Sequence, residues 1–203
     1  MAPKIIAIAG TSSDCGKTTL LCDLLRELSC LEAWEAIKLT RGHYRSCGKD
    51  PHACCVSHLL GDEPVIRSGM KETKVIGKDT GRYWDAGAAN VHWVIVTNDQ
   101  VEQGIRRAIE RVDARNVLIE GTSFLRYIPA DLAILVARPD PIKLKPSARY
   151  ALLNGLIDVL YLFGDGDSKS LISQDQLNAS APLPLYTRRE LSQLITLIRD
   201  ATG

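Results

Sequence analysis

The chain has 203 residues, a length that fits one α/β domain, and its 45% of apolar and 24% of charged residues are ordinary values for a globular protein with a sizeable core. Its formal net charge of +1 excludes the strong overall field typical of many nucleic-acid-binding proteins, and we expect neither a nucleic-acid nor a membrane partner. No apolar run reaches the roughly 20 residues that span a bilayer, so we expect the chain in the cytoplasm.

Short apolar runs alternate with longer helical patterns along the chain. Residues 5–9 are predicted to form a buried strand, residues 17–28 an amphipathic helix and residues 36–40 a second strand. Further strands are predicted at 75–77, 91–97, 116–120, 131–137, 159–163 and 183–186, and further helices at 80–89, 100–112, 146–156 and about 187–201. This alternation predicts a three-layer α/β fold with a mainly parallel sheet, as a single domain over residues 1–203 with a polar insert at about 41–70.

A glycine-rich segment follows the first predicted strand and leads into the first predicted helix. Small residues allow backbone N–H groups to surround phosphate oxygens, and the N-terminus of a helix adds partial positive charge. In this order of strand, loop and helix, a Lys-Thr pair places the lysine on the β- and γ-phosphates and the threonine hydroxyl on Mg²⁺. The predicted phosphate-binding loop, or P-loop, consists of Gly10, Thr11, Ser12, Ser13, Asp14, Cys15, Gly16, Lys17, Thr18 and Thr19.

The loop differs in length from the commonest form. Five residues separate Gly10 from Gly16, where four are usual, and Thr11 follows Gly10 directly. This Gly-Thr-x4-Gly-Lys-Thr pattern resembles the loop of dethiobiotin synthetase and its relatives, a class that includes nitrogenase iron protein. The second lysine that marks this class early in the loop is absent here. The pattern therefore argues for nucleotide binding more than for fast chemistry.

Two further residues are expected beside the phosphates. An apolar run at residues 117–119 ends in Glu120 and Gly121, and Glu120 is predicted to bind Mg²⁺ together with Thr18, directly or through water. Lys38 lies towards the end of the second predicted strand. It is either a surface lysine or, with Lys17, a catalytic lysine that stabilises charge developing on the γ-phosphate.

A block from Gly77 to Ala88, containing Gly-Lys-Asp-Thr, Arg82 and Ala-Gly-Ala, resembles a block of the molybdopterin-guanine dinucleotide biosynthesis protein B family. The resemblance extends in order over about residues 4–137. It implies binding of GTP or ATP with Mg²⁺, slow hydrolysis, a homodimer, and a helper role beside a cofactor-biosynthesis enzyme that attaches a nucleotide to the molybdenum cofactor. Within the block, Lys78 and Arg82 form a candidate second anion site, and Asp79 is expected to cap the following helix.

The polar insert is rich in cysteine and histidine. Thiolates together with imidazole suit Zn²⁺ or an iron–sulfur cluster, and a dimer would complete such a ligand set across its two-fold axis. A surface loop of reduced cysteines is the other interpretation. The candidate metal ligands are Cys47, Cys54, Cys55 and His58.

Two other functions stay open at this stage. One is an ATP-dependent carboxylate-activating synthase resembling dethiobiotin synthetase, although that family carries an aspartate where Ser12 stands here. The other is a nucleotide-gated metal sensor or chaperone without substrate turnover, which would use the Cys/His insert. The motif for reading guanine, Asn-Lys-x-Asp, is missing, so both ATP and GTP are candidate ligands.

Overall fold

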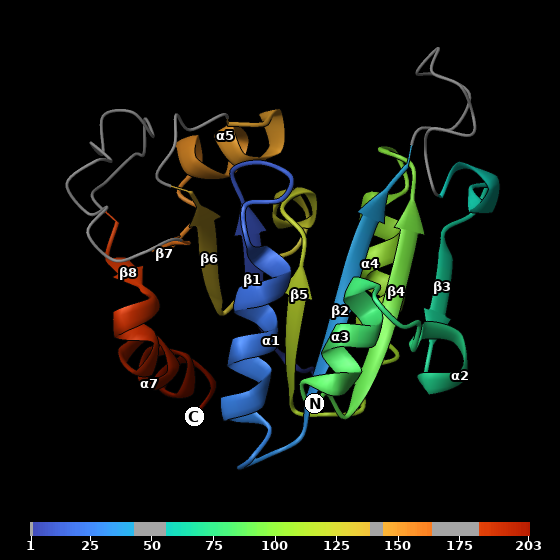
Figure 1. Cartoon of the computed structure of the whole chain (residues 1–203). Helices are drawn as coiled ribbons and strands as arrows, with labels where there is room; N and C mark the ends of the chain where they lie inside the picture. Colours follow the sequence, from blue (N-terminus) through green and yellow to red (C-terminus); the bar gives the residue numbers. More distant parts are fainter. Residues whose placement is uncertain (1, 43–55, 139–143, 164–182) are drawn as a thin grey trace.

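An eight-stranded sheet forms the centre of the molecule (Figure 1). The computed structural model describes residues 2–42, 56–138, 144–163 and 183–203. The strand order is β3-β4-β2-β5-β1-β6-β7-β8, and every neighbouring pair is parallel except β3 with β4. The strands are β1 (Lys4–Gly10), β2 (Trp34–Arg41), β3 (Val65–Ser68), β4 (Asn90–Val96), β5 (Asn116–Glu120), β6 (Leu132–Ala137), β7 (Val159–Leu162) and β8 (Leu185–Thr187).

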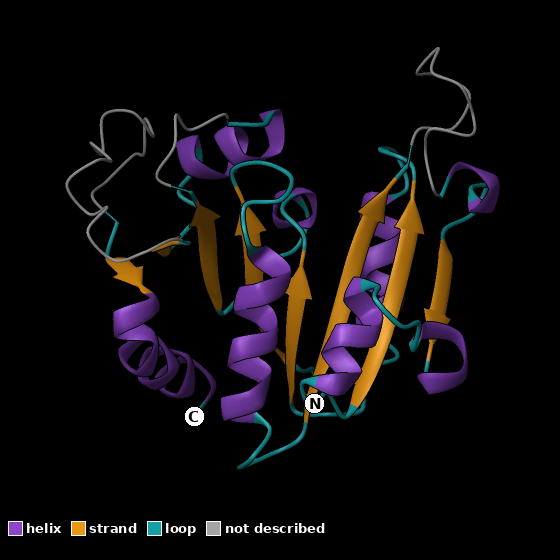
Figure 2. Ribbon diagram, viewed as in Figure 1, coloured by secondary structure: helices purple, strands orange, loops and turns teal. Residues whose placement is uncertain are grey.

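Helices cover both faces of this sheet (Figure 2). One apolar cluster joins α1, α3 and α7 to one face, and a second joins α4, α5 and η3 to the other. The sheet between two helical layers confirms the predicted three-layer α/β fold. The α-helices are α1 (Lys17–Leu28), α2 (Met70–Thr73), α3 (Asp79–Asp85), α4 (Val101–Ile109), α5 (Pro146–Leu153) and α7 (Leu191–Thr202), and the 3₁₀ helices are η2 (Ser57–Leu59), η3 (Ser123–Arg126) and η5 (Arg188–Glu190).

The structure differs from the predicted elements in two places. Residues 75–77 form a turn that leads into α3, because the backbone N–H of Lys78 donates to the Val75 carbonyl; the strand predicted there is wrong. The strand β3 lies within the predicted polar insert, where it pairs antiparallel with β4 at the sheet edge. A capping box of Thr187 and Glu190 opens the last helical segment. Across the described ranges, no helix is both long enough and apolar enough to cross a bilayer.

A row of polar side-chain contacts joins three strands at the end of the sheet where β2 and β4 begin. His92 on β4 contacts Glu35 on β2 (Nε2 to Oε2, 2.7 Å) and Ser68 on β3 (Nδ1 to Oγ, 2.8 Å). The other oxygen of Glu35 accepts hydrogen bonds from the backbone N–H groups of Asp113 and Ala114, both at 2.8 Å. Burial opposes the charged carboxylate, but His92 and the two amides outweigh it and lower the pKa of Glu35.

Since the pKa of Glu35 is lower in the folded than in the unfolded chain, its stabilising effect is present above the unfolded pKa and is lost as the pH falls through the folded pKa. We expect Glu35→Gln to lower the free energy of unfolding at pH 7 by about 2 kcal/mol, the scale of hydrogen bonds to a charged group. The variant should also lose less stability than the parent in acid. Urea unfolding from pH 7 to pH 3 measures both effects. Glu32→Gln, at an exposed position, is the control, and equal acid sensitivity of the Glu35 variant and the parent would contradict the assignment.

Candidate functional site

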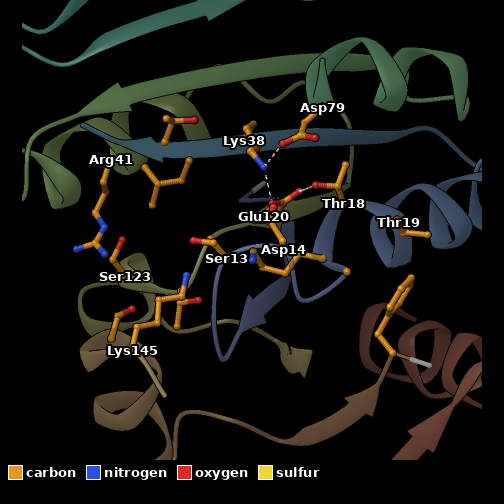
Figure 3. Close-up of a pocket in the computed structure, with 18 of the residues that line it drawn as sticks. Ser13, Asp14, Thr18, Thr19, Lys38, Arg41, Asp79, Glu120, Ser123 and Lys145 are labelled. Carbon is orange, nitrogen blue, oxygen red and sulfur yellow. Dashed lines mark hydrogen bonds and ion pairs between the residues drawn. The ribbon is translucent and has the colours of Figure 1, made fainter. Parts of the chain in front are cut away.

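The candidate site lies where the parallel strands end, at the central strand β1. The direction in which the chain adds strands reverses at β1: β2 follows β1 towards one edge of the sheet, and β6 follows β5 towards the other edge. Ligands of open α/β sheets bind at such a reversal, beyond the carboxyl ends of the strands. A cavity of about 650 Å³ opens there (Figure 3). Its lining comes from the loop after β1, the ends of β2 and β5, and residues from α3 and α5.

The loop between β1 and α1 has the backbone geometry of an anion cradle. Asp14 and Gly16 both have positive φ, at 55° and 103°, which turns successive peptide groups inward. A Cβ on Gly16 would lie 2.4 Å from the Phe163 ring, so this position requires glycine for space as well as for φ. The helix α1 begins immediately at Lys17, whose Nζ donates to the Ser12 carbonyl at 3.0 Å. The helix N-terminus and the Lys17 ammonium therefore point at the same cavity.

The predicted P-loop residues divide into two groups. Four of them are not part of the cavity lining: Gly10, Thr11, Ser12 and Cys15. They connect the loop to the sheet, since the Thr11 N–H donates to the Val136 carbonyl on β6 at 3.0 Å. The residues that line the cavity are Ser13, Asp14, Gly16, Lys17, Thr18 and Thr19.

Glu120 is the buried centre of the site, with 3% of its surface exposed. Lys38 on β2 lies beside it in register, and the Lys38 Nζ is 2.5 Å from Glu120 Oε1. The Thr18 hydroxyl donates to Glu120 Oε2 at 2.7 Å, and the hydroxyl of Tyr83 on α3 donates to the same oxygen. One carboxylate thus joins α1, β2 and α3, and the interpretation of Lys38 as a surface lysine is wrong.

Asp79 lies in the cavity as well. The expected helix cap is wrong, because Asp79 is the first residue of α3 and no side chain caps that helix; instead its carboxylate contacts Lys38 Nζ at 2.6 Å. Burial opposes charge on both groups. The Glu120 and Asp79 carboxylates outweigh it and raise the pKa of Lys38, while Lys38 lowers the pKa of Asp79. Lys38 is therefore a charged lysine held between two carboxylates (Figure 3).

The same group of side chains fits Mg²⁺. This ion prefers carboxylate and hydroxyl oxygens, and usually takes one or two carboxylates plus substrate phosphates. Asp79 and Glu120 present carboxylate oxygens to a cation, the Lys38 ammonium, and the Thr18 hydroxyl lies at the other oxygen of Glu120. Thr18 and Glu120 were predicted as Mg²⁺ ligands, and Asp79 joins them in the fold. The only signal for Asp79 in the sequence was its place in the Gly-Lys-Asp-Thr block.

The other predicted site residues are distributed differently. Arg82 lines the cavity near Thr19, to which its guanidinium donates at 3.3 Å, but Lys78 is exposed and outside the lining. Lys78 therefore does not reach the cavity, and a second anion site formed by Lys78 with Arg82 stays a prediction. Cys47, Cys54 and Cys55 lie outside the described residues, whereas His58 is exposed on η2. Among the residues that the structure describes, no group of three or more His, Cys, Asp or Glu side chains is arranged for a metal.

Several lining residues had no motif to mark them. Arg41 ends β2, Ser123 begins η3 and Lys145 precedes α5, and all three lie at one end of the cavity (Figure 3). Burial, and after it the charge of Lys17, lowers the pKa of Lys145 to about 8. Only the parallel packing of distant strands places these residues beside the phosphate loop.

A substitution at Gly10 tests how closely the P-loop is packed. A Cβ at this position would lie 2.6 Å from Cys15 Sγ and 2.7 Å from Lys17 Cδ, so we expect Gly10→Ala to displace Lys17 and to cost about 1–3 kcal/mol of stability, the usual scale of overpacking. Thermal unfolding checks the expectation. The matched control is Gly61→Ala, where an added Cβ meets nothing within 4 Å. If the two variants unfold alike, the close packing under the loop is not as described.

The chain was compared with known proteins. No family model and no curated protein match it, but solved structures match its fold. HypB from Helicobacter pylori, in complex with nickel, superposes with a TM-score of 0.54 at 12% identity, over 99% of this chain and 87% of that one.

LpxK from Aquifex aeolicus, in complex with ATP, superposes with a TM-score of 0.50 at 18% identity, over 92% of this chain and 54% of that one. This chain therefore spans about half the length of LpxK. Identities this low speak for the fold alone. Together with the loop between β1 and α1 and the mainly parallel sheet, they establish that the chain has the P-loop NTPase fold.

Proposed function

We propose that this protein binds a nucleoside triphosphate with Mg²⁺ and hydrolyses it slowly. The observation that carries the proposal is the convergence of Lys17, Thr18, Asp79 and Glu120 on one cavity at the end of β1. Lys17, the loop amides and the N-terminus of α1 would hold the phosphates. Thr18, Glu120 and Asp79 would hold Mg²⁺, which neutralises charge on the phosphates.

Slow hydrolysis follows from the state of Lys38. A lysine stabilises a transition state when its charge is free to meet the developing charge on the γ-phosphate. Here the Asp79 and Glu120 carboxylates, at 2.6 and 2.5 Å, already balance the charge of Lys38. Catalytic use of Lys38 therefore requires that Mg²⁺ or the nucleotide first displace it from this pair, and a fast reaction is not expected without a partner that drives the change.

The wider role that we propose is help in cofactor assembly, of the kind carried out by the molybdopterin-guanine dinucleotide biosynthesis protein B family. Its support is the resemblance of the Gly77–Ala88 block, part of which, from Asp79 to Tyr83, contributes three side chains to the site. Homodimerisation and a cofactor-biosynthesis enzyme as partner belong to the same proposal. ATP and GTP both fit the phosphate site, because the contacts described above recognise phosphates and Mg²⁺ and not the base.

The phosphate assignment is tested by Lys17→Ala. Hydrogen bonds to charged groups contribute about 1.5–3 kcal/mol each, so loss of the ammonium should weaken binding of the triphosphate on the order of 100-fold. Isothermal titration with Mg-ATP and with Mg-GTP measures the change and ranks the two nucleotides. Lys78→Ala, which removes an exposed lysine outside the cavity, should leave the affinity unchanged. Equal binding by the Lys17 variant and the parent would refute the proposal.

The Mg²⁺ assignment has its own test at Thr18. Thr18→Val keeps the shape of the side chain but removes the hydroxyl, whereas Thr18→Ser keeps the hydroxyl. We expect the valine variant to lose roughly tenfold of the affinity that Mg²⁺ adds to nucleotide binding, about one hydrogen bond to a charged group, and the serine variant to retain it. The measurement is the ratio of the nucleotide Kd with Mg²⁺ to that with EDTA. A ratio unchanged in the valine variant would remove Thr18 from the metal site.

A further inference from the structure

The charges that line the cavity are unequally distributed. Among the described residues, six basic and three acidic side chains line it: the basic residues are Lys17, Lys38, Arg41, Arg82, Arg138 and Lys145, and the acidic residues are Asp14, Asp79 and Glu120. Two of the three carboxylates hold Lys38. In the described ranges, neither Arg41 nor Lys145 forms an ion pair with a carboxylate; the one side-chain partner of Arg41 is the neutral amide oxygen of Asn98, at 3.0 Å.

These two cations gather at one end of the cavity. Figure 3 shows Arg41, Ser123 and Lys145 together on one side of the P-loop, with Thr19 at the far side. In a P-loop the lysine reaches the β- and γ-phosphates. The Lys17 Nζ donates to the Ser12 carbonyl, and the backbone N–H of Lys145 donates to the carbonyl of the preceding residue, Thr11, so both lysines lie against the same part of the loop. A bound triphosphate would therefore bring its γ-phosphate, at Lys17, towards the end of the cavity where Arg41 and Lys145 lie.

The group is held firmly against the loop. The backbone N–H of Lys145 donates to the Thr11 carbonyl at 2.9 Å, which joins the start of α5 directly to the P-loop. Arg41, whose side chain is exposed, is the last residue of β2 and pairs there with Val96 of β4. Ser147 lies in the same lining, and its buried hydroxyl has no hydrogen-bond partner within the described part of the chain. A rigid arrangement of this kind suits the recognition of a specific ligand.

Bringing like charges together costs free energy that a bound anion would recover. Burial is the largest cause that lowers the pKa of Lys145 to about 8, and the charge of Lys17 is the next. The charge of Arg41 acts in the same direction, whereas Cys15 and Glu120 act in the opposite one. Clustered positive charge of this kind, in a cavity, is typical of sites built for an anionic ligand.

We propose that Arg41, Ser123 and Lys145 form a subsite for a second ligand, one that carries a carboxylate or phosphate group and binds beside the γ-phosphate of the nucleotide. The inference rests on the proposed function, because the γ-phosphate defines what the subsite adjoins. It places the second anion at the opposite end of the cavity from Arg82, and it leaves Lys78 with no part in it. The two basic side chains would pair with the oxyanion and the Ser123 hydroxyl would donate to it.

Sulfate is the probe for this subsite, because its charge does not change between pH 7 and pH 9. The full chain is first saturated with Mg²⁺ and a non-hydrolysable analogue of ATP or GTP, and sulfate is then titrated by calorimetry. We expect Arg41→Gln and Lys145→Met each to weaken sulfate binding at least tenfold while the Kd of the nucleotide analogue changes less than threefold. Arg149→Gln, an exposed cation on α5 outside the cavity, should bind sulfate as the parent does.

The pH provides a second measurement. Before an anion binds, Lys145, with a pKa of about 8, carries its charge at pH 7 and has mostly lost it at pH 9. The bound triphosphate raises this pKa, so the parent should bind sulfate more weakly at pH 9 by up to about tenfold. In Lys145→Met this difference should disappear.

The outcomes separate the two proposals. Failure of the parent to bind either nucleotide analogue refutes the proposed function, and the inference with it. Normal nucleotide binding with no sulfate binding refutes the inference alone. Sulfate that binds only when the nucleotide is absent occupies the phosphate loop itself, and overturns the inference. Acetate and methyl phosphate, titrated in the same way, then decide which oxyanion the subsite prefers.

Discussion

The buried carboxylate of Glu120 is the contact on which the site depends. It is 3% exposed, and it meets the Thr18 hydroxyl, the Lys38 ammonium and the Tyr83 hydroxyl at the end of a central strand. A buried charge is tolerated only when it is paired and hydrogen-bonded, so Glu120 depends on all three of these partners. Burial, and after it the Glu120 carboxylate, raises the pKa of Tyr83 well above the usual value. The Tyr83 hydroxyl therefore stays protonated and donates to Glu120. Loss of any partner would leave Glu120 less well compensated.

This carboxylate also links the fold to the proposed chemistry. Parallel pairing places Lys38 directly beside Glu120 on neighbouring strands, and the first residue of α3 adds Asp79 to the same lysine. The resulting group of two carboxylates and one ammonium has a formal net charge of −1. An ion that enters it must compete with Lys38, which couples metal binding to the release of a lysine beside the phosphates. Such a coupling gives nucleotide binding a structural consequence, as expected of a protein that assists an assembly step more than one that turns over rapidly.

The other end of the cavity has the opposite electrostatic character. Within the described residues, neither Arg41 nor Lys145 pairs with a carboxylate, and Lys145 is held against the P-loop through the Thr11 carbonyl. The site is thus divided into a half with two carboxylates, suited to a metal ion, and a basic half, suited to an oxyanion. The phosphate loop lies between them. A nucleotide in the loop would bring a metal-bound phosphate chain and a second anionic ligand into one cavity, where the two could be held close together.

Features that depend on local order could be predicted from the chain's residues alone. The strand, the small-residue loop, Lys17 and the amphipathic helix are consecutive, so their periodicity and spacing predicted the P-loop, the alternation of strands and helices and the end of β5 at Glu120. Which distant residues complete the site depends on how the strands pack. Asp79 was interpreted as a helix cap, Lys145 had no motif, and the edge strand β3 was too short and polar to be recognised. The physical reason is that side-chain roles at the ends of parallel strands depend on the strand order β2-β5-β1-β6, and long crossovers set this order without leaving a local pattern.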